Sequence, residues 1–420
     1  MRNIKFSLIA VLAMGTISNM PLYSAETLQD SLVNGKFSGE FRFLYAGGTN
    51  SKIAATNPVN NSNVGSGAIE LNYISAPFYG FELGIGFESG HDFGFHDYDG
   101  SSEDDARNSV SATHLHNFFL KYTYSKSSLI VGRQTIKLPL LMNSGAFPIE
   151  DYFEAATFVT KDIPDTLLNV AVVSKWYKRY GSDATSSVVQ QDIHYDDPLY
   201  SIYIKNNSIP NLTLDGQYLS TNEETNDGDA PILVSGGFDQ YYVRGDYKLP
   251  TALPMTFGIM YGGADFDNTG EEDASFYGVK LGLALEKVKF DLAYTSVDDD
   301  HDYPSTLGHV PDAVLYTAML TNQAITAGTD TISLQADIDF GVKGLKTIAK
   351  VAHFEQSDTG MANSAIRLDE SDEVNLDIKY SFDGVLKGFS TRLYMGYSDY
   401  DVDGVSDDFT YARLYLSYKF

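Results

Sequence analysis

The sequence predicts an all-β fold, a transmembrane antiparallel up-and-down β-barrel of about 18 strands. Three observations predict it. Segments of about 9–12 residues alternate apolar and polar side chains, which is the period of a two-faced strand and the length that crosses a bilayer at a tilt. The connectors between these segments alternate between short and long. Nearly all of the net charge of −27 lies in the long connectors.

The first 25 residues have the features of an export signal peptide. Arg2 and Lys5 precede an apolar run, residues 6–17, that is too short to span a bilayer as a helix. Cleavage is expected near Ser24 or Ala25. No later stretch has the roughly 18 consecutive apolar residues of a transmembrane helix. The chain has no cysteine, so disulfides do not stabilise the exported protein.

The predicted barrel strands each have one apolar face. In residues 35–46, the aromatic residues Phe37 and Phe41 alternate with Glu40 and Arg42. The same alternation recurs at residues 81–89, 275–286, 330–340, 372–382 and 409–420. In hydrocarbon every backbone N–H and C=O must be paired, so a spanning sheet must close on itself. We therefore expect a barrel over residues 35–420 in which the last strand pairs with the first.

The connectors also predict which end of the barrel is which. Eight short connectors and nine long ones make 17 connections, which implies 18 strands. Short turns at one end and long loops at the other are typical of outer-membrane barrels, whereas a soluble sandwich has no reason to segregate loop length. The acidic balance argues against a nucleic-acid-binding protein, which needs basic patches. The long connectors are near residues 47–65, 90–112, 134–153, 175–198, 222–238, 266–274, 298–330, 358–371 and 399–408.

The segments "LYLSYKF", "AETLQDSLVNGKFSGEFRFLY" and "ELNYISAPFYGFELGIGF" resemble parts of the OprD-type family of bacterial outer-membrane porins. The terminal "LYLSYKF" resembles the assembly signal read by the outer-membrane insertion machinery. "AETLQDSLVNGKFSGEFRFLY" resembles the family's short periplasmic helix, here residues 26–34, followed by the first strand. "ELNYISAPFYGFELGIGF" resembles its first periplasmic hairpin. "LIVGRQTIKLPLL", "FPIEDYFEAATFV" and "DIPDTLLNVAVV" resemble the region of its inward-folded third loop.

The resemblance has consequences for location and assembly. It implies an 18-stranded barrel in the outer membrane of a Gram-negative bacterium, passive diffusion, and often a homotrimer. The expected partners are outer-membrane lipid and lipopolysaccharide, together with small solutes and ions. The major porins of Campylobacter-like bacteria are a second family that the sequence resembles.

The polar faces of the strands predict the lining of the lumen. A cation buried at the bilayer midplane would cost a few kcal/mol, so basic strand residues are expected to point inward. Such a wall would attract and orient anions. Alternatively, the cations pair with inward acids such as Glu40, Asp215 and Asp377 and only hold the wall together. The predicted pore-lining cations are Arg42, Lys121, Arg133, Lys137, Arg244, Lys280, Lys350, Lys379, Arg392 and Arg413.

The third long connector, residues 134–153, is unusually apolar for a loop. Water would meet Leu138, Leu140 and Leu141 if it lay outside, so we expect it to fold into the lumen. An alternative is a subunit-contact loop. Folding inward would place three acids opposite the basic wall and so create a transverse field across a narrow opening. These acids are Glu150, Asp151 and Glu154.

Two other connectors carry weaker signals. The apolar run at residues 313–320 predicts either a short helix that caps the mouth or an ordered surface loop. Asp399, Asp401 and Asp403 stand at the offsets of a calcium loop, but the residue at its twelfth position is Thr410 rather than glutamate. The alternative there is a solvated acidic turn.

The predicted function is a passive diffusion channel for small hydrophilic solutes and ions. A basic lumen wall facing an acidic constriction loop would favour small anionic or zwitterionic solutes. The alternatives are a barrel enzyme, such as a protease or lipase, and a structural or adhesive surface protein. No catalytic arrangement is found, because the acids and histidine of residues 298–302 are consecutive and point apart. We therefore expect that the protein is not an enzyme and needs no cofactor other than a possible, weakly bound calcium ion.

Overall fold

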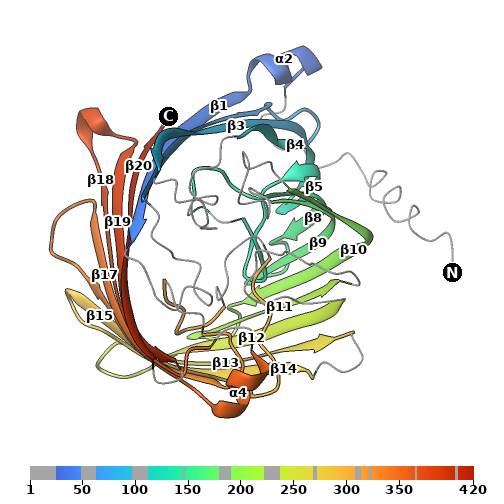
Figure 1. The fold of residues 1–420 in the computed structure, drawn as a ribbon. Coiled ribbons are helices and arrows are strands. Elements are labelled where there is room, and N and C mark those ends of the chain that lie inside the picture. The colour runs from blue at the N-terminus through green and yellow to red at the C-terminus, as the bar shows by residue number, and fades with distance from the viewer. Residues whose placement is uncertain are drawn as a thin grey trace.

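The computed structural model describes residues 25–48, 63–96, 112–143, 145, 147–178, 191–221, 237–267, 272–307, 314–320, 324–364, 367–402 and 405–420. The predicted signal peptide, apart from Ala25, lies outside these residues. The described chain forms a closed barrel with further segments inside it (Figure 1).

Eighteen strands of the described chain form one antiparallel sheet, which confirms the predicted fold class. Each strand pairs with its neighbours along the barrel wall, so the chain meanders up and down. The strands are β1 (Lys36–Gly48), β2 (Asn63–Ile74), β3 (Phe81–His96), β4 (Ala112–Tyr124), β5 (Ser127–Gln134), β8 (Tyr152–Thr160), β9 (Thr166–Lys178), β10 (Gln191–Asn206), β11 (Leu212–Thr221), β12 (Phe238–Leu249), β13 (Met255–Phe266), β14 (Ala274–Ala284), β15 (Val288–Val297), β16 (Thr329–Ile338), β17 (Leu345–Gln356), β18 (Glu370–Ser381), β19 (Phe389–Val402) and β20 (Val405–Lys419).

The remaining elements are short. They are the helices α2 (Leu28–Val33) and α4 (Asp358–Asn363), the 3-10 turn η2 (Gly384–Leu386), and the hairpin of β6 (Lys137–Leu138) and β7 (Leu141–Met142). Thr27 caps α2, because its hydroxyl accepts the backbone N–H of Asp30 at 3.0 Å. No helix in the described part of the chain is long and apolar enough to cross a membrane.

The barrel closes where β1 pairs with β20, as predicted. Gly39 and Phe420 exchange two backbone hydrogen bonds of 3.0 Å. The Phe420 ring packs against Phe41 with 5.6 Å between centroids. Gly39 makes room for it, since a Cβ there would lie 2.4 Å from the Phe420 ring. Because β1 and β20 satisfy each other, neither remains an open sheet edge.

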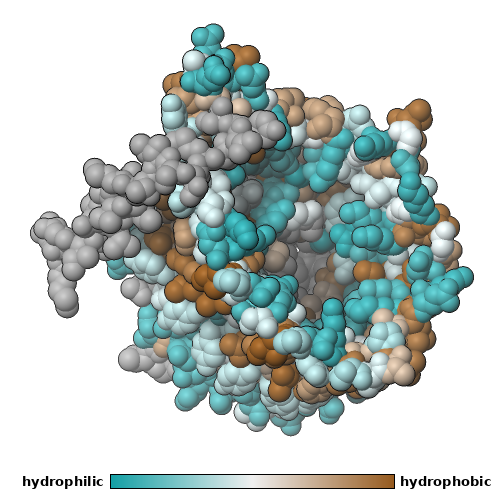
Figure 2. All heavy atoms as spheres, turned by 180° about the vertical axis from the view of Figure 1, so that it is seen from behind, coloured by the Kyte–Doolittle hydropathy of each residue, from teal (hydrophilic) through white to brown (hydrophobic). Residues whose placement is uncertain are grey.

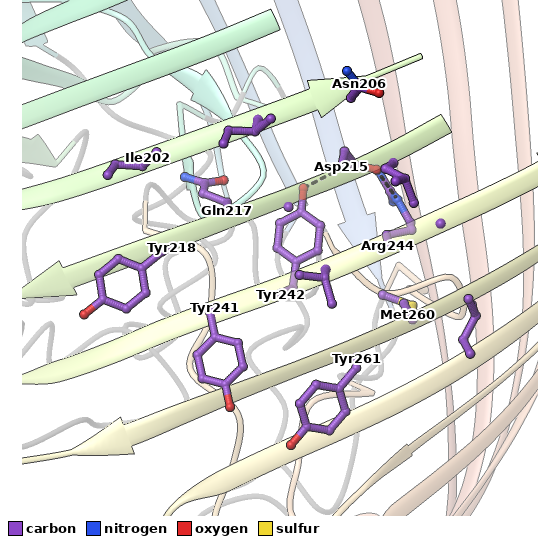
Figure 3. Close-up of a pocket in the computed structure, with 16 residues that line it drawn as sticks. Ile202, Asn206, Asp215, Gln217, Tyr218, Tyr241, Tyr242, Arg244, Met260 and Tyr261 are labelled. Carbon is purple, nitrogen blue, oxygen red and sulfur yellow. Dashed lines mark hydrogen bonds and ion pairs between the residues drawn. The ribbon is translucent and has the colours of Figure 1, made fainter. Parts of the chain in front are cut away.

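The two faces of the wall differ in polarity, and Figure 3 shows this on β11–β13. Asp215 and Arg244 are joined on the inner side, where Tyr242 is also buried. Tyr218 and Tyr261 alternate with them and are exposed on the outer side. Viewed along the barrel, hydrophilic residues surround the hollow centre (Figure 2). Large hydrophobic side chains such as Phe41, Val243 and Ile259 are exposed on the strands. Such an exposed apolar surface is unfavourable in water and suits a bilayer.

The connector after β19 is shorter than predicted. β19 ends at Val402 and β20 begins at Val405, and Asp399 pairs in register with Asp408. The prediction of a long loop over residues 399–408 is therefore wrong. The acidic residues there did not indicate a loop, because strands that extend beyond the bilayer meet water and tolerate charge on their faces.

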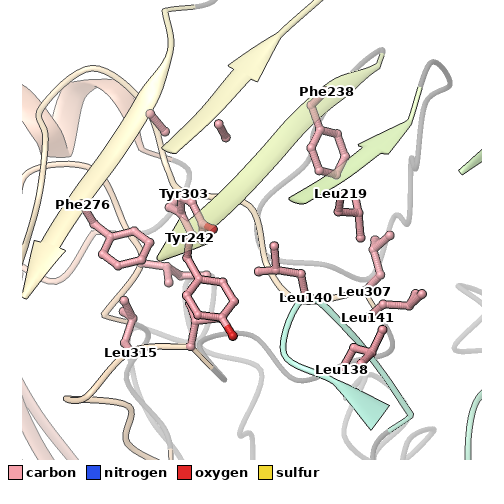
Figure 4. Close-up of a cluster of buried hydrophobic side chains, with 14 of the residues drawn as sticks. Leu138, Leu140, Leu141, Leu219, Phe238, Tyr242, Phe276, Tyr303, Leu307 and Leu315 are labelled. Carbon is pink, nitrogen blue, oxygen red and sulfur yellow. The ribbon is translucent and has the colours of Figure 1, made fainter. Parts of the chain in front are cut away.

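The third long connector folds into the lumen, as predicted. We call residues 135–151 the inward segment. Leu138, Leu140 and Leu141 are buried in a cluster shared with the inner wall (Figure 4). The backbone N–H of Leu140 donates to the Gln217 side chain at 2.8 Å. Burial in the lumen removes these leucines from water, which is the physical reason for the inward path.

A second connector also enters the lumen. Met142 N–H donates to Leu307 O at 2.8 Å, and Leu141 pairs with Leu307 as a parallel bridge. Residues 298–307 therefore brace the inward segment. The cluster in Figure 4 joins the inward segment to this second connector. It contains Leu138, Leu140, Leu141, Tyr303, Leu307 and Leu315.

The apolar run at residues 313–320 is neither a helix nor a surface loop in its described part, residues 314–320. Lys350 Nζ donates to Tyr316 O at 3.1 Å and to Ala318 O at 2.8 Å. Leu320 N–H donates to Glu373 Oε1 at 3.0 Å. The wall side chains thus satisfy backbone groups that a helix would pair internally. The predicted helical cap is wrong, and residue 313 lies outside the described chain.

Candidate functional site

A polar cavity of about 400 Å³ lies between the inward segment and the inner wall. The wall side comes from β1, β2, β4 and β18–β20, and residues from Thr135 to Glu150 form the other side. Both signs of charge reach this cavity. Its charged lining residues are Glu40, Arg42, Glu70, Lys137, Glu150, Lys379, Arg392 and Lys419.

Arg42 joins the inward segment to the wall. Its Nη2 lies 3.1 Å from Glu150 Oε1 and also contacts Glu70. Its Nε lies 3.3 Å from Glu40 Oε2, and its Nη1 lies 3.3 Å from Glu88 Oε1. Four carboxylates therefore surround one guanidinium. Arg42 Nη1 also donates to Pro148 O at 3.4 Å. Arg42 therefore also contacts the backbone of the end of the inward segment near Phe147, Pro148 and Glu150, which we call the tip.

Strand register explains why these carboxylates meet. Glu40 pairs with Glu70, Glu70 with Glu88, and Glu88 with His114, across β1 to β4. We call Glu40, Glu70 and Glu88 the acidic row. Like charges directly opposite on neighbouring strands repel, so the row needs a counter-charge. Arg42 is two residues from Glu40 on the same strand face and supplies it.

A bulge in β4 adds two more polar groups to this wall. Between Gly86 and Phe87 the register of β3 against β4 shifts by one residue, and His116 is the extra residue. A bulge lets two successive residues share a face, and here His116 and Asn117 both face inward. Gly86 makes this possible, because a Cβ there would lie 2.7 Å from the His116 ring. Asn117 then donates to Asn72 Oδ1 at 3.3 Å.

Glu150 is the member of this group that the loop contributes. Burial raises the pKa of Glu150 above the ordinary carboxyl value. Arg42 opposes that effect and Glu88 adds to it. Asn143 also donates from its side-chain amide to Glu150, within the inward segment. The carboxyl is therefore held at the tip from both sides.

The comparisons with known proteins place this barrel in a family. Residues 83–420 match the family described as outer membrane porin, OprD family. The chain belongs to the OprD family. It is therefore a porin of the Gram-negative outer membrane, and the lumen is a channel for small solutes. No curated protein sequence matches it significantly.

Solved porin structures share the fold. Pseudomonas aeruginosa OpdO is 18% identical, with a TM-score of 0.73 over 93% of this chain and 98% of that one. Pseudomonas aeruginosa OpdK with vanillate is 16% identical, with a TM-score of 0.72 over 93% and 99%. Acinetobacter baumannii OccAB3 is 16% identical, with a TM-score of 0.72 over 92% and 100%.

Two arginines of this porin that were predicted to line the pore pair with inward acids instead of standing alone. Arg244 binds Asp215 through two hydrogen bonds of 2.9 and 3.0 Å. Arg392 binds Asp377 through two of 2.7 and 2.8 Å. The alternative reading, in which wall cations pair with inward acids, therefore describes these residues. Lys379 pairs in register with Arg392 and remains exposed at the cavity.

Three predicted lysines hold other parts of the barrel interior. Lys121 lies 2.9 Å from Glu82 on the neighbouring strand. Lys280 lies 2.8 Å from Asp246, and Lys350 binds the backbone of residues 316–318. These contacts pair the lysine ammonium groups with acidic side chains or backbone carbonyls of the barrel interior. By contrast, Lys137 is exposed on the inward segment and borders the cavity.

Arg413 lies beside the tip of the inward segment. Its guanidinium carbon lies 4.9 Å from the centre of the Phe147 ring, and its Nε donates to Tyr411 Oη at 2.8 Å. This cation–π contact adds a second link between the basic wall and the segment.

The three acids that were predicted to oppose the basic wall do not act together. Glu150 reaches the cavity, but Asp151 is fully buried and accepts a hydrogen bond from Trp176 Nε1 at 3.3 Å. Glu154 lies on β8 and pairs with Arg133 at 2.9 Å. The expectation that all three face the basic wall is therefore wrong. Glu150 and Asp151 are consecutive, so their side chains point in different directions. Glu154 is part of the barrel wall, so it cannot face that wall from the inward segment.

The first part of the segment predicted to bind calcium is a strand rather than a loop. Asp399 and Asp401 lie on β19, where Asp401 accepts a hydrogen bond from Ser406 at 3.3 Å within the hairpin. A calcium loop needs a turn that gathers its oxygens, and an extended strand does not provide one. Asp403 lies outside the described residues. Among those described, no group of three or more histidines and acids is placed to hold a metal ion.

Sequence reasoning missed the acidic row as a unit. Glu70, Glu88 and His114 each occupy polar positions of strands, but which of them meet depends on register. His116 could not be assigned to the lumen, because the bulge reverses the alternation after it. The nearest sequence signal is Gly86, a glycine inside a strand pattern, which is a common mark of a bulge.

Proposed function

We propose that this porin passes small anionic or zwitterionic solutes through the cavity beside the inward segment. The observation that supports this best is the separation of charge around the cavity. Lys379 and Arg392 lie on β18 and β19, whereas Glu40 and Glu70 lie on β1 and β2. Lys137 adds a cation from the inward segment.

Such a separation orients a dipolar solute. Its carboxylate would face Lys379 and Arg392, and its ammonium group would face Glu70. Low-dielectric walls focus the field of the charges into the opening, so the effect is stronger there than in bulk water. Glu40 and Glu70 come from the wall, so they supply the negative side that was expected from the loop.

The test is planar-bilayer conductance of the purified porin, with reversal potentials measured in a salt gradient. We expect discrete current steps. The double variant Arg392→Ser with Arg413→Ser should lower the anion-to-cation permeability ratio by about twofold, as expected for loss of wall charges screened over roughly a Debye length. Lys343→Ser, in an exposed turn, is the control for loss of a positive charge away from the cavity.

The outcomes separate two claims. An absence of discrete steps would contradict the channel itself. Steps with an unchanged permeability ratio in the double variant would leave the channel but contradict the role of the basic wall. A ratio that falls equally in the control would assign the effect to overall charge.

We also propose a periplasmic position for the N-terminal helix and assembly as a homotrimer. Helix α2 packs on the turn after β2, where Ser31 Oγ donates to Ala76 O and Ala25 N–H donates to Pro77 O at 2.8 Å. That contact supports a periplasmic position for residues 26–34, beside a short connector. Assembly as a homotrimer remains a prediction from the family.

A further inference from the structure

We infer that the acidic row and its two histidines form a proton-dependent selectivity determinant of the channel. Protonation of His114 and His116 would neutralise surplus carboxylates beside the cavity and shift the permeability ratio toward anions. The inference rests on the proposed function, because it requires that the lumen conducts. It concerns different residues from the basic wall.

The histidines are buried against the carboxylates. His114 Nε2 lies 3.3 Å from Glu88 Oε2, and His116 Nε2 lies 3.5 Å from Glu70 Oε1. Both imidazole side chains are more than nine-tenths buried. Neither ring makes a hydrogen bond of standard geometry with the described residues. A neutral imidazole in that position leaves polar atoms unsatisfied, and a protonated one would donate to the nearby carboxylate.

The charge balance gives the direction of the effect. Glu40, Glu70, Glu88 and Glu150 surround Arg42, so four carboxylates and one guanidinium carry a formal charge of −3. Two protonated imidazoles would reduce this to −1. Histidine is the side chain whose charge ordinarily changes between about pH 5 and 8.

Other charged groups and one tyrosine lie close to the acidic row and the histidines. Lys419 on β20 lies 3.4 Å from Glu40, and Lys137 on the inward segment faces Glu150. The Tyr152 ring on β8 lies 5.1 Å from His114, and Arg133 on β5 lies over that tyrosine. Lysine, arginine and tyrosine side chains ordinarily titrate well above the range in which histidine does. The inference therefore concerns the histidines and the carboxylates that they face, whereas Glu150, whose pKa burial raises, is common to the wild type and the histidine variants.

The row is placed to influence permeating ions. Glu40, Glu70 and Glu150 border the cavity directly, and Arg42 borders it between them. His114 and His116 sit behind these groups and act through them. They are specificity-determining by position, and they need not touch the solute.

The experiment compares reversal potentials of the porin at about pH 7.5 and about pH 5. For the wild type we expect the anion-to-cation permeability ratio to rise by about twofold on acidification, the size expected for two charges roughly 10 Å from the ion path with screening. His114→Gln combined with His116→Gln should lose most of that rise. His353→Gln, whose imidazole is half-exposed and pairs with Asp372, is the matched control and should keep it.

A second variant covers the case in which the double variant does not fold. Glu88→Gln removes the carboxylate that His114 faces, so it should raise the ratio at neutral pH and reduce the further rise on acidification. A wild-type ratio that does not change with pH would overturn the inference. So would an undiminished rise in the folded variants. Absence of current in the wild type would instead contradict the proposed function.

Discussion

Replacing Arg42 with glutamine tests whether that residue holds the inward segment in place. Glutamine removes the positive charge that four carboxylates share, from β1, β2, β3 and the inward segment. The wall strands remain joined by their backbone hydrogen bonds. The loss should therefore fall on the contact between Arg42 and the tip at Pro148 and Glu150.

The size of the effect follows from burial. The Arg42 side chain is only 16% exposed, so solvent screening reduces the interaction little. Removing one partner of a buried ion pair costs about 3–5 kcal/mol. At about 1.4 kcal/mol per tenfold change, the equilibrium between a docked and a released tip would shift by roughly two to four powers of ten. Leu138, Leu140 and Leu141 would still anchor the rest of the segment.

Single-channel recording is the assay. Arg42→Gln should give a larger and noisier conductance, and a stronger preference for cations because the acidic row loses its counter-charge. Lys419→Gln is the matched control, since it removes one positive charge that pairs with Glu40 on the wall rather than with the inward segment. Conductance and noise equal to the wild type, or equal changes in both variants, would refute the reasoning.

Three further predictions concern stability and the inward segment. Leu140→Ala removes a fully buried side chain at a cost of about 2–5 kcal/mol and should raise single-channel conductance by loosening that segment. Phe420→Ala loses the ring packed at the closing strand pair; because Phe420 is half-exposed, a cost of about 1–2 kcal/mol should appear as a lower unfolding temperature. Hydrogen bonds from Ser125 and Ser127 hold the pKa of Asp162 below its ordinary value, so its stabilisation is present above the ordinary carboxyl pKa and is lost as pH falls through the lowered one. Asp162→Asn should therefore lower the unfolding temperature at neutral pH and make no difference in strong acid.

The barrel was predictable because its determinants are local. Period-two alternation fixes the strands, and the need to pair every backbone group fixes closure between the first and last of them. The inward path of residues 135–151 was also predictable, because Leu138, Leu140 and Leu141 are too apolar for an exposed loop. None of these inferences requires knowledge of which strand residues lie opposite one another.

The chemistry of the lumen depends on that missing knowledge. Polar alternation places Glu40, Glu70 and Glu88 inward, but only strand register makes them one row around Arg42. A shift of one residue moves a side chain to the other face, and the bulge at His116 is such a shift. The sequence therefore predicts a charged lumen without predicting which charges cancel.

The most direct test of the account is whether ions pass beside the inward segment. The protein has no cysteine, so a thiol reagent would label only an introduced one. Ser390 borders the cavity, and its neighbour Thr391 does not. Single-channel current through Ser390→Cys should fall sharply after labelling with a bulky charged thiol reagent, while Thr391→Cys keeps its current. Unchanged current in labelled Ser390→Cys would show that the ions take another route.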